Sequence, residues 1–133
     1  MTPEKLQNLN EEKLFNYLKD NHISDLSGAS QYSYTDCSSA KYKVVIELKC
    51  RKTHYPTLLI EEHKYNELMK HPKCRYICST PKGIYSFSLH HLPKPEFFIQ
   101  YMPATSEFEN NNLVPKSVAY LNISDAKNIL EII

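Results

Sequence analysis

The stretch from Lys43 to Cys50, which reads KVVIELKC, constrains the fold more than any other part of the chain. It predicts a β-strand of a buried sheet, because strand side chains alternate between two faces. The apolar face holds Val44, Ile46, Leu48 and Cys50, and the mixed face holds Val45, Glu47, Lys49 and Arg51. A carboxylate and an ammonium thus share one face of a core strand, which is costly unless a partner or a metal ion uses them.

The composition fits one soluble domain. The chain has 133 residues, of which 41% are hydrophobic and 23% are charged. No run approaches the ~18 apolar residues that a transmembrane helix needs. The first residues also lack the basic and then apolar segments of a signal peptide. We therefore expect a cytoplasmic protein, of a cell or of an infected cell, with no membrane partner.

The net charge of +1 does not by itself indicate a nucleic-acid-binding protein. The basic residues are nevertheless clustered near the central strand, where a single acid, Glu47, accompanies them. They are Lys41, Lys43, Lys49, Arg51 and Lys52. Such a stripe can hold a polyanion without an extreme pI. A solvated strand edge protected by lysines explains the pattern equally well.

The cysteine pattern does not favour a metal-stabilised or disulfide-bonded fold. Disulfides are not expected without a signal peptide, and no Cys-x-x-Cys pair occurs. Zinc would need Cys74 and Cys78 together with histidines such as His90 or His91, and that spacing fits no common structural site. A zinc-stabilised structural protein is therefore the least favoured functional class.

The periodicity of apolar residues predicts an α/β domain, a small mixed sheet flanked by helices. Helices are expected over residues 3–20 and 61–70, with a short one from residue 124. Strands are expected over residues 31–37, 43–51, 75–79, 84–89, 97–102 and 118–121, with extended chain at 58–60. A loop is expected over residues 106–115. Gly83 is expected to supply a positive φ in the turn after Pro81.

Asp36 is expected to lie beside the central strand. A short turn joins its strand to the next, so that a hairpin would bring Asp36 near Glu47. Mg²⁺ prefers oxygen ligands and usually takes one or two carboxylates together with waters and substrate phosphate. The backbone carbonyl of Leu48 would complete the protein ligands, and Lys49 would lie beside a bound water. An ion-pair network at the end of a sheet explains the same residues without a metal.

Asp36, followed by Val44-Val45-Ile46-Glu47-Leu48-Lys49, resembles the motif of the PD-(D/E)xK nuclease superfamily, which has the restriction-endonuclease-like fold. The resemblance implies that Asp36 and Glu47 bind Mg²⁺ (or Mn²⁺) and that Lys49 is the catalytic lysine. Thr35 stands where the family name has proline.

The first helix extends this resemblance. Several members of the superfamily, including archaeal Holliday-junction resolvases, use a glutamate there, followed by apolar residues at the third, fourth and seventh positions. Glu11 fits that pattern better than Glu12 does, and the resemblance implies that Glu11 is a catalytic residue that supports a second metal ion. Residues 8–11 also resemble a helix-capping box, which would explain Glu11 without a catalytic role.

Two further segments, residues 55–65 and 102–108, are similar to small stand-alone nuclease-like proteins of tailed bacteriophages. This similarity implies that Glu61 and Lys64 face the cleft, although an exposed helix pair is an equally good explanation. Many tyrosines and phenylalanines invite base stacking. The strand periodicity assigns Tyr76, Tyr85 and Phe87 to the core, so no aromatic residue is singled out for stacking.

Together these observations predict a Mg²⁺-dependent endonuclease that hydrolyses DNA, branched or duplex. A structure-selective role in phage recombination, replication or DNA processing is expected, in the host cytoplasm if a phage encodes the chain. Arg51, Lys52, Lys41 and Lys64 are the residues expected to contact DNA. Many relatives act as dimers, so a homodimer is a further expectation. The alternative is a catalytically inactive module of the same fold that binds nucleic acid or protein.

Overall fold

The computed structural model describes residues 1–30, 33–103 and 112–128. Three helices are present in this part of the chain: α1 (Pro3–Gln7), α2 (Glu11–Asn21) and α3 (Glu62–Met69). The strands are β1 (Ser27–Ser30), β2 (Ser33–Ser39), β3 (Val44–Cys50), β4 (Thr57–Glu61), β5 (Cys74–Thr80), β6 (Gly83–Phe87), β7 (Phe98–Pro103), β8 (Leu113–Asn122) and β9 (Lys127–Asn128). Two 3-10 turns, η1 (Leu89–His91) and η2 (Ile123–Asp125), complete the elements. The predicted α/β class is confirmed. None of the described helices is long and apolar enough to cross a membrane.

The strands form two sheets. Sheet A has the order β1-β2-β3-β5-β6-β9, and sheet B has the order β4-β8-β7. Sheet A is mixed, because β3 and β5 run parallel while its other neighbours are antiparallel. The parallel pair needs a crossover. The chain makes it by leaving sheet A after β3, pairing β4 into sheet B, and returning through α3 to β5.

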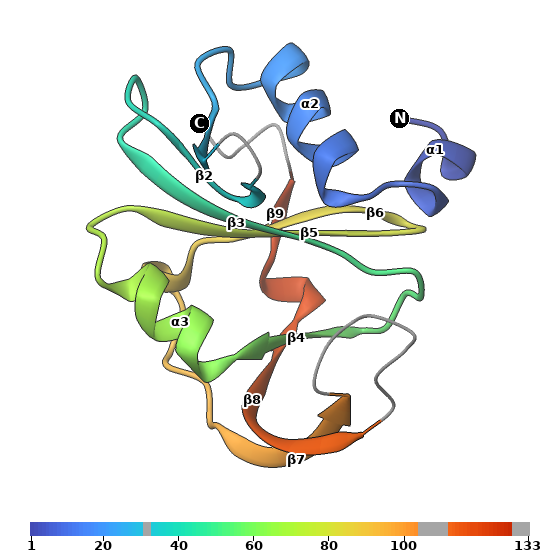
Figure 1. Ribbon diagram of the computed structural model, residues 1–133, viewed down its shortest axis with the longest axis vertical. Coiled ribbons are helices and arrows are strands. Elements are labelled where there is room, and N and C mark those ends of the chain that lie inside the picture. Colours follow the sequence, from blue (N-terminus) through green and yellow to red (C-terminus); the bar gives the residue numbers. More distant parts are fainter. Residues whose placement is uncertain (31–32, 104–111, 129–133) are drawn as a thin grey trace.

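The molecule has three layers, with sheet A in the middle (Figure 1). Helix α2 covers one face of sheet A, whereas α3 and sheet B cover the other face. The first core contains Leu18 of α2 and Ile46 of β3, and the second contains Tyr65 of α3 and Phe87 of β6. Burial on both faces explains why every residue of β5 is buried.

The chain expected to form one helix over residues 3–20 forms two. Thr2 caps α1, as its position before Pro3 indicates, since the Thr2 hydroxyl accepts a hydrogen bond from the Lys5 amide at 3.2 Å. The Asn8 side chain then donates to the Glu4 carbonyl at 2.9 Å. Asn10 accepts from the Lys13 amide at 2.8 Å and caps α2, so the capping residue is Asn10 and not Asn8. Asparagine side chains compete with helical hydrogen bonds in this way.

Several other expectations need correction. Sheet B was not expected, and residues 113–115 belong to β8 instead of a loop. The expected tail helix is replaced by η2 and β9 in the described residues. Gly83 has no positive φ; among the described residues Lys43 has one, of 53°. The Thr80 hydroxyl supports the turn instead, because it accepts the Lys82 amide at 3.1 Å. Residues 31–32 and 104–111 of the predicted segments lie outside the described residues.

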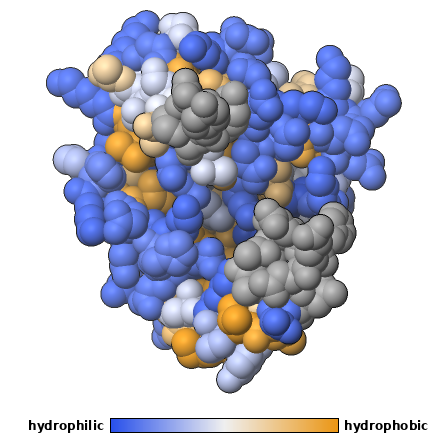
Figure 2. All heavy atoms as spheres, in the orientation of Figure 1, coloured by the Kyte–Doolittle hydropathy of each residue, from blue (hydrophilic) through white to orange (hydrophobic). Residues whose placement is uncertain are grey.

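Sheet B exposes apolar side chains at its outer edge. Phe98, Ile99 and Tyr101 of β7 and Leu113 of β8 are all exposed. Figure 2 shows hydrophobic atoms gathered at this lower end of the molecule, over β7 and β8. Single exposed apolar residues are common on soluble proteins, and three of these four lie on β7, the strand that ends the sheet, while Leu113 begins its neighbour β8.

Candidate functional site

The hairpin of β2 and β3 places Asp36 directly opposite Glu47. Directly opposed residues on paired strands share a face and lie close together. The prediction that a hairpin brings the two carboxyl groups together is therefore confirmed. Asp36 is exposed and Glu47 is buried, so the pair spans from solvent into the protein.

The surroundings of Glu47 favour its neutral form. Burial is the main reason that the pKa of Glu47 rises to about 8, and a hydrogen bond to Asp36 raises it further against the opposing charge of Lys64. At neutral pH, Glu47 therefore favours its protonated form, which lies within hydrogen-bond reach of the Asp36 side chain.

Glu47 lies in a cleft of about 460 Å³ between the two sheets. Sheet A contributes Glu47 and Lys49 of β3 and Tyr76 of β5, and Arg51 follows directly after β3. Helix α3 contributes Lys64, and sheet B contributes Leu59, Glu61, Met102, Pro103 and Lys116. The predicted mixed face of β3 thus forms one wall of the cleft, and its apolar face lies in the core under α2. Lys49 lines the same cavity as Glu47, two residues further along the strand.

Helix α3 supplies a counter-charge to Glu47. The ammonium of Lys64 lies 3.2 Å from Glu47 Oε1. Burial lowers the pKa of Lys64, but the charge and hydrogen bond of Glu47, together with the charges of Asp36 and Glu61, outweigh burial and the pKa rises. Glu47 contributes its charge here because it is ionised in the alkaline range, above its own pKa of about 8, where Lys64 titrates. Lys64 therefore remains charged. It lines the cleft, which is the position that the similarity to phage proteins implies.

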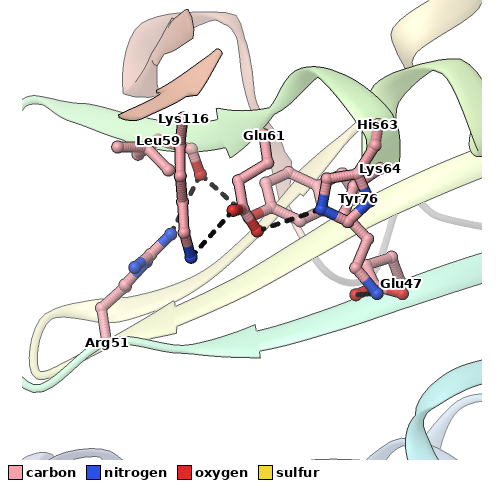
Figure 3. Close-up of polar contacts among 8 residues, drawn as sticks. All are labelled: Glu47, Arg51, Leu59, Glu61, His63, Lys64, Tyr76 and Lys116. Atoms are coloured by element: carbon pink, nitrogen blue, oxygen red, sulfur yellow. Dashed lines mark hydrogen bonds and ion pairs between the residues drawn. The ribbon is translucent and has the colours of Figure 1, made fainter. Parts of the chain in front are cut away.

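A second carboxylate, Glu61, is held by Lys116 and His63 (Figure 3). Lys116 lies 3.2 Å from Glu61 Oε1, and His63 lies 3.5 Å from Oε2. Burial raises the pKa of Glu61, but hydrogen bonds and charge from Lys116 and His63 outweigh it and the pKa falls. Glu61 is therefore ionised and engaged, whereas Glu47 is protonated.

The carbonyl of Leu59 joins the two walls of the cleft. It accepts hydrogen bonds from Arg51 Nη2 at 3.0 Å and from the Tyr76 hydroxyl at 2.9 Å (Figure 3). Arg51 belongs to the end of β3 and Tyr76 to β5, so one carbonyl of β4 connects sheet B to two strands of sheet A. Arg51 lines the cleft, as predicted, with part of its guanidinium engaged by the protein.

The backbone of β3 orients the carbonyl of Leu48 toward β2. The amides of Val45 and Arg51 donate to β5, at 3.1 Å and 2.8 Å. Alternate residues of a strand present their backbone groups to opposite sides. The carbonyl of Leu48 therefore points away from β5, to the side where Asp36 lies, while its side chain is fully buried. This direction fits the predicted backbone ligand.

Glu11 lies at the edge of this site. It is the first residue of α2, and its Oε1 accepts a long hydrogen bond of 3.5 Å from the Cys50 amide. Cys50 is two residues beyond Leu48, so its amide faces the same side of β3. Glu11 does not line the cleft of Glu47 and Lys49. It approaches the site along the strand edge instead.

Two of the four residues expected to contact DNA lie outside the cleft. Lys41 is exposed in the turn before β3, and its amide donates to Asp25 at 2.9 Å. This turn is at the opposite end of β3 from Arg51, roughly 20 Å away for a strand of this length. Lys52 is exposed, and its ammonium contacts the Leu9 carbonyl at 3.3 Å.

Sequence reasoning missed Lys116 and the hydroxyl of Tyr76. Lys116 reaches the cleft because β8 pairs with β4 and places Lys116 within reach of Glu61. Tyr76 was assigned to the core, and its ring is buried there while its hydroxyl lines the cleft. A charged residue between the valines at 114 and 118 was the available signal for Lys116.

The donor atoms fit Mg²⁺ better than zinc. No cluster of three or more histidine, cysteine, aspartate or glutamate side chains is present in the described ranges. Mg²⁺ needs only one or two carboxylates beside waters and a phosphate, and the Asp36–Glu47 pair with the Leu48 carbonyl meets that need. All four cysteines are free, and burial raises the pKa of Cys37 and of Cys78 to about 12.

No protein-family model, curated protein or solved structure significantly matches the chain.

Proposed function

We propose that the chain is a Mg²⁺- or Mn²⁺-dependent endonuclease of the PD-(D/E)xK type that hydrolyses DNA. The observation that carries this proposal is the pairing of Asp36 with Glu47, together with Lys49, which lies on the same face of β3 as Glu47 and lines the same cleft as Glu47. That arrangement is what the sequence resemblance implies. A mixed sheet with helices on both faces supports a restriction-endonuclease-like fold.

Each group of the site has a distinct role in this proposal. Asp36, Glu47 and the Leu48 carbonyl hold the ion. A bound divalent ion supplies an acidified water and polarises the phosphoryl oxygen. Lys49 orients the attacking water and stabilises negative charge that develops on the phosphate. Glu11, at the strand edge, supports the site through the Cys50 amide.

The charge of the cleft favours a phosphate backbone. Four of its ten lining residues are basic and two are acidic. Burial favours the protonated form of Glu47 at neutral pH, and Lys116 offsets the charge of Glu61, so Lys49, Arg51 and Lys64 leave a basic excess. Cationic clefts attract polyanions by focusing their field. A cleft of about 460 Å³ contacts only a short length of DNA. Because the contact is small, the cleft is better suited to recognising the shape of duplex or branched DNA than to recognising a long base sequence.

A cleavage assay tests the proposal. We expect purified protein to cut duplex or branched DNA in Mg²⁺ or Mn²⁺ and not in EDTA. Asp36→Asn and Lys49→Ala should each lower the rate about 10²–10⁴-fold, the usual contribution of such groups. Lys41→Ala, an exposed lysine outside the cleft, is the matched control and should retain activity. If linear, branched and single-stranded DNA all stay intact in either metal, or if Lys49→Ala cuts at the wild-type rate, the proposal fails.

A catalytically inactive binding module is the second candidate, and the contact of Lys64 with Glu47 favours it. An ammonium 3.2 Å from Glu47 Oε1 can replace a metal ion as the counter-charge of the pair. Calorimetry with Mg²⁺ and Mn²⁺ separates the two functions. The nuclease requires metal binding that Asp36→Asn abolishes, whereas the module binds nucleic acid with equal affinity in the presence and absence of these ions.

A further inference from the structure

A second cavity lies beside the cleft, at the end of β3. Its volume is about 300 Å³, and it is lined among others by Arg51, Lys52, Tyr55, Leu59 and Tyr120. Arg51 and Leu59 line both cavities, so the two are neighbours that meet at these residues. We call the second cavity the Tyr55 pocket.

The Tyr55 pocket presents two exposed aromatic rings. Tyr55 belongs to the loop between β3 and β4, and 60% of its surface is exposed. Tyr120 of β8 is 42% exposed although its ring stacks on Phe98, with centroids 5.9 Å apart and planes inclined by 25°. Its hydroxyl donates to Gln100 Oε1 at 2.7 Å, which fixes the ring. A fixed aromatic ring with a solvent-accessible surface is ready to stack with a planar ligand.

The charge beside these rings indicates an anionic ligand. Arg51 and Lys52 line the same pocket, and none of the described residues that line it is acidic. Aromatic rings beside basic side chains are the combination that binds unpaired nucleotides, because bases stack while phosphates meet the cations. The volume of about 300 Å³ equals roughly ten waters of ~30 Å³ each, enough for a base of about ten non-hydrogen atoms.

We propose that the Tyr55 pocket holds an unpaired nucleotide of the strand whose backbone occupies the cleft. This inference rests on the proposed function, because it takes the cleft as the place of the phosphates. Glu47 on β3 and Arg51, the residue directly after β3, are four residues apart, about 13 Å in extended chain. That span is roughly four steps of ~3.4 Å in a stacked strand. The favoured substrate is thus a duplex with unpaired nucleotides a few positions from the bond that is cut.

Binding of labelled hairpin duplexes, measured by fluorescence anisotropy in EDTA, tests the inference without cleavage. One duplex is blunt, and the other carries an unpaired tail of deoxyribonucleotides or ribonucleotides. We expect the tailed forms to bind more tightly, and Tyr55→Ala to weaken their binding roughly five-fold to a hundred-fold. Tyr55→Phe keeps the ring and should restore affinity. Tyr101→Ala, which removes an equally exposed tyrosine of β7 outside the pocket, should have no effect.

The inference is wrong if blunt and tailed duplexes bind with equal affinity, or if Tyr55→Ala and Tyr101→Ala weaken tail binding equally. Its failure is distinct from failure of the nuclease proposal. If the protein prefers tailed duplexes through Tyr55 but never cuts DNA, the nucleotide-binding role of the Tyr55 pocket is supported and the nuclease proposal is refuted. If cleavage depends on Lys49 but tailed and blunt duplexes bind equally, the role of the Tyr55 pocket is refuted and the nuclease proposal is supported.

Discussion

Replacing Glu47 with glutamine should change how the stability of the protein depends on pH. The unfolded chain has the ordinary glutamate pKa of 4.5, and the folded chain raises the pKa of Glu47 to about 8. Between these values the unfolded state releases a proton that the folded state keeps. The stabilising effect of the proton is complete below about pH 4.5 and is lost as pH rises through about 8.

The size of the effect follows from the two pKa values. Each pKa unit corresponds to ~1.36 kcal/mol, so a difference of about 3.5 sets an upper limit of about 5 kcal/mol. Glutamine cannot ionise and keeps a donor for Asp36. The free energy of unfolding of Glu47→Gln, relative to wild type, should therefore rise between about pH 5 and about pH 9, by several kcal/mol at most.

Urea denaturation across that pH range measures the difference. Histidines and other groups titrate in both proteins, so their contributions cancel. Glu67→Gln is the matched control, because Glu67 is an exposed glutamate of α3 whose pKa is lowered by its hydrogen bond with Lys70. Its curve should run parallel to that of wild type over this range. If the wild-type and Glu47→Gln curves are also parallel, Glu47 does not hold a proton in the folded state and the reasoning is refuted.

Two further predictions concern single residues. Lys64→Ala should raise the pKa of Glu47 further, since the charge of Lys64 opposes protonation; a carboxyl-detected NMR titration checks this, and an unchanged midpoint contradicts it. Gly83→Ala should change the free energy of unfolding by less than ~1 kcal/mol, because φ is not positive and the new methyl meets only the end of the Tyr85 side chain at 3.3 Å. Thermal or urea denaturation measures it, and a loss of several kcal/mol would show that the turn requires glycine.

The parts of the site that are set by residues close together in the sequence could be predicted. The alternation in β3 assigns Glu47 and Lys49 to one face, and a short turn brings Asp36 opposite Glu47. Sheet B was not predictable in this way. Its strand β4 pairs with β8, where Thr57 meets Asn122, and no local pattern specifies a pairing over such a separation. The contribution of Lys116 to the cleft depends on that pairing and was missed with it.

The break between α1 and α2 has a local cause that periodicity overlooks. The side chains of Asn8 and Asn10 bond to nearby backbone groups and end one helix while starting the next. The apolar residues at the third, fourth and seventh positions after Glu11 are Leu14, Phe15 and Leu18. They share a buried helix face as expected, because all three lie within α2. The position of Glu11 as the first residue of α2 follows from the same break.

Because the crossover between β3 and β5 runs past the cleft, most residues that line the cleft come from one segment of the chain. One continuous segment, residues 47–64, supplies six of the ten lining residues, including both acids. The hairpin of β7 and β8 supplies Met102, Pro103 and Lys116 from a separate part of the chain. Changes in that hairpin can therefore reshape the opposite wall while the carboxyl pair and Lys49 keep their places. Substrate preference and chemistry can then vary independently, each through its own stretch of sequence.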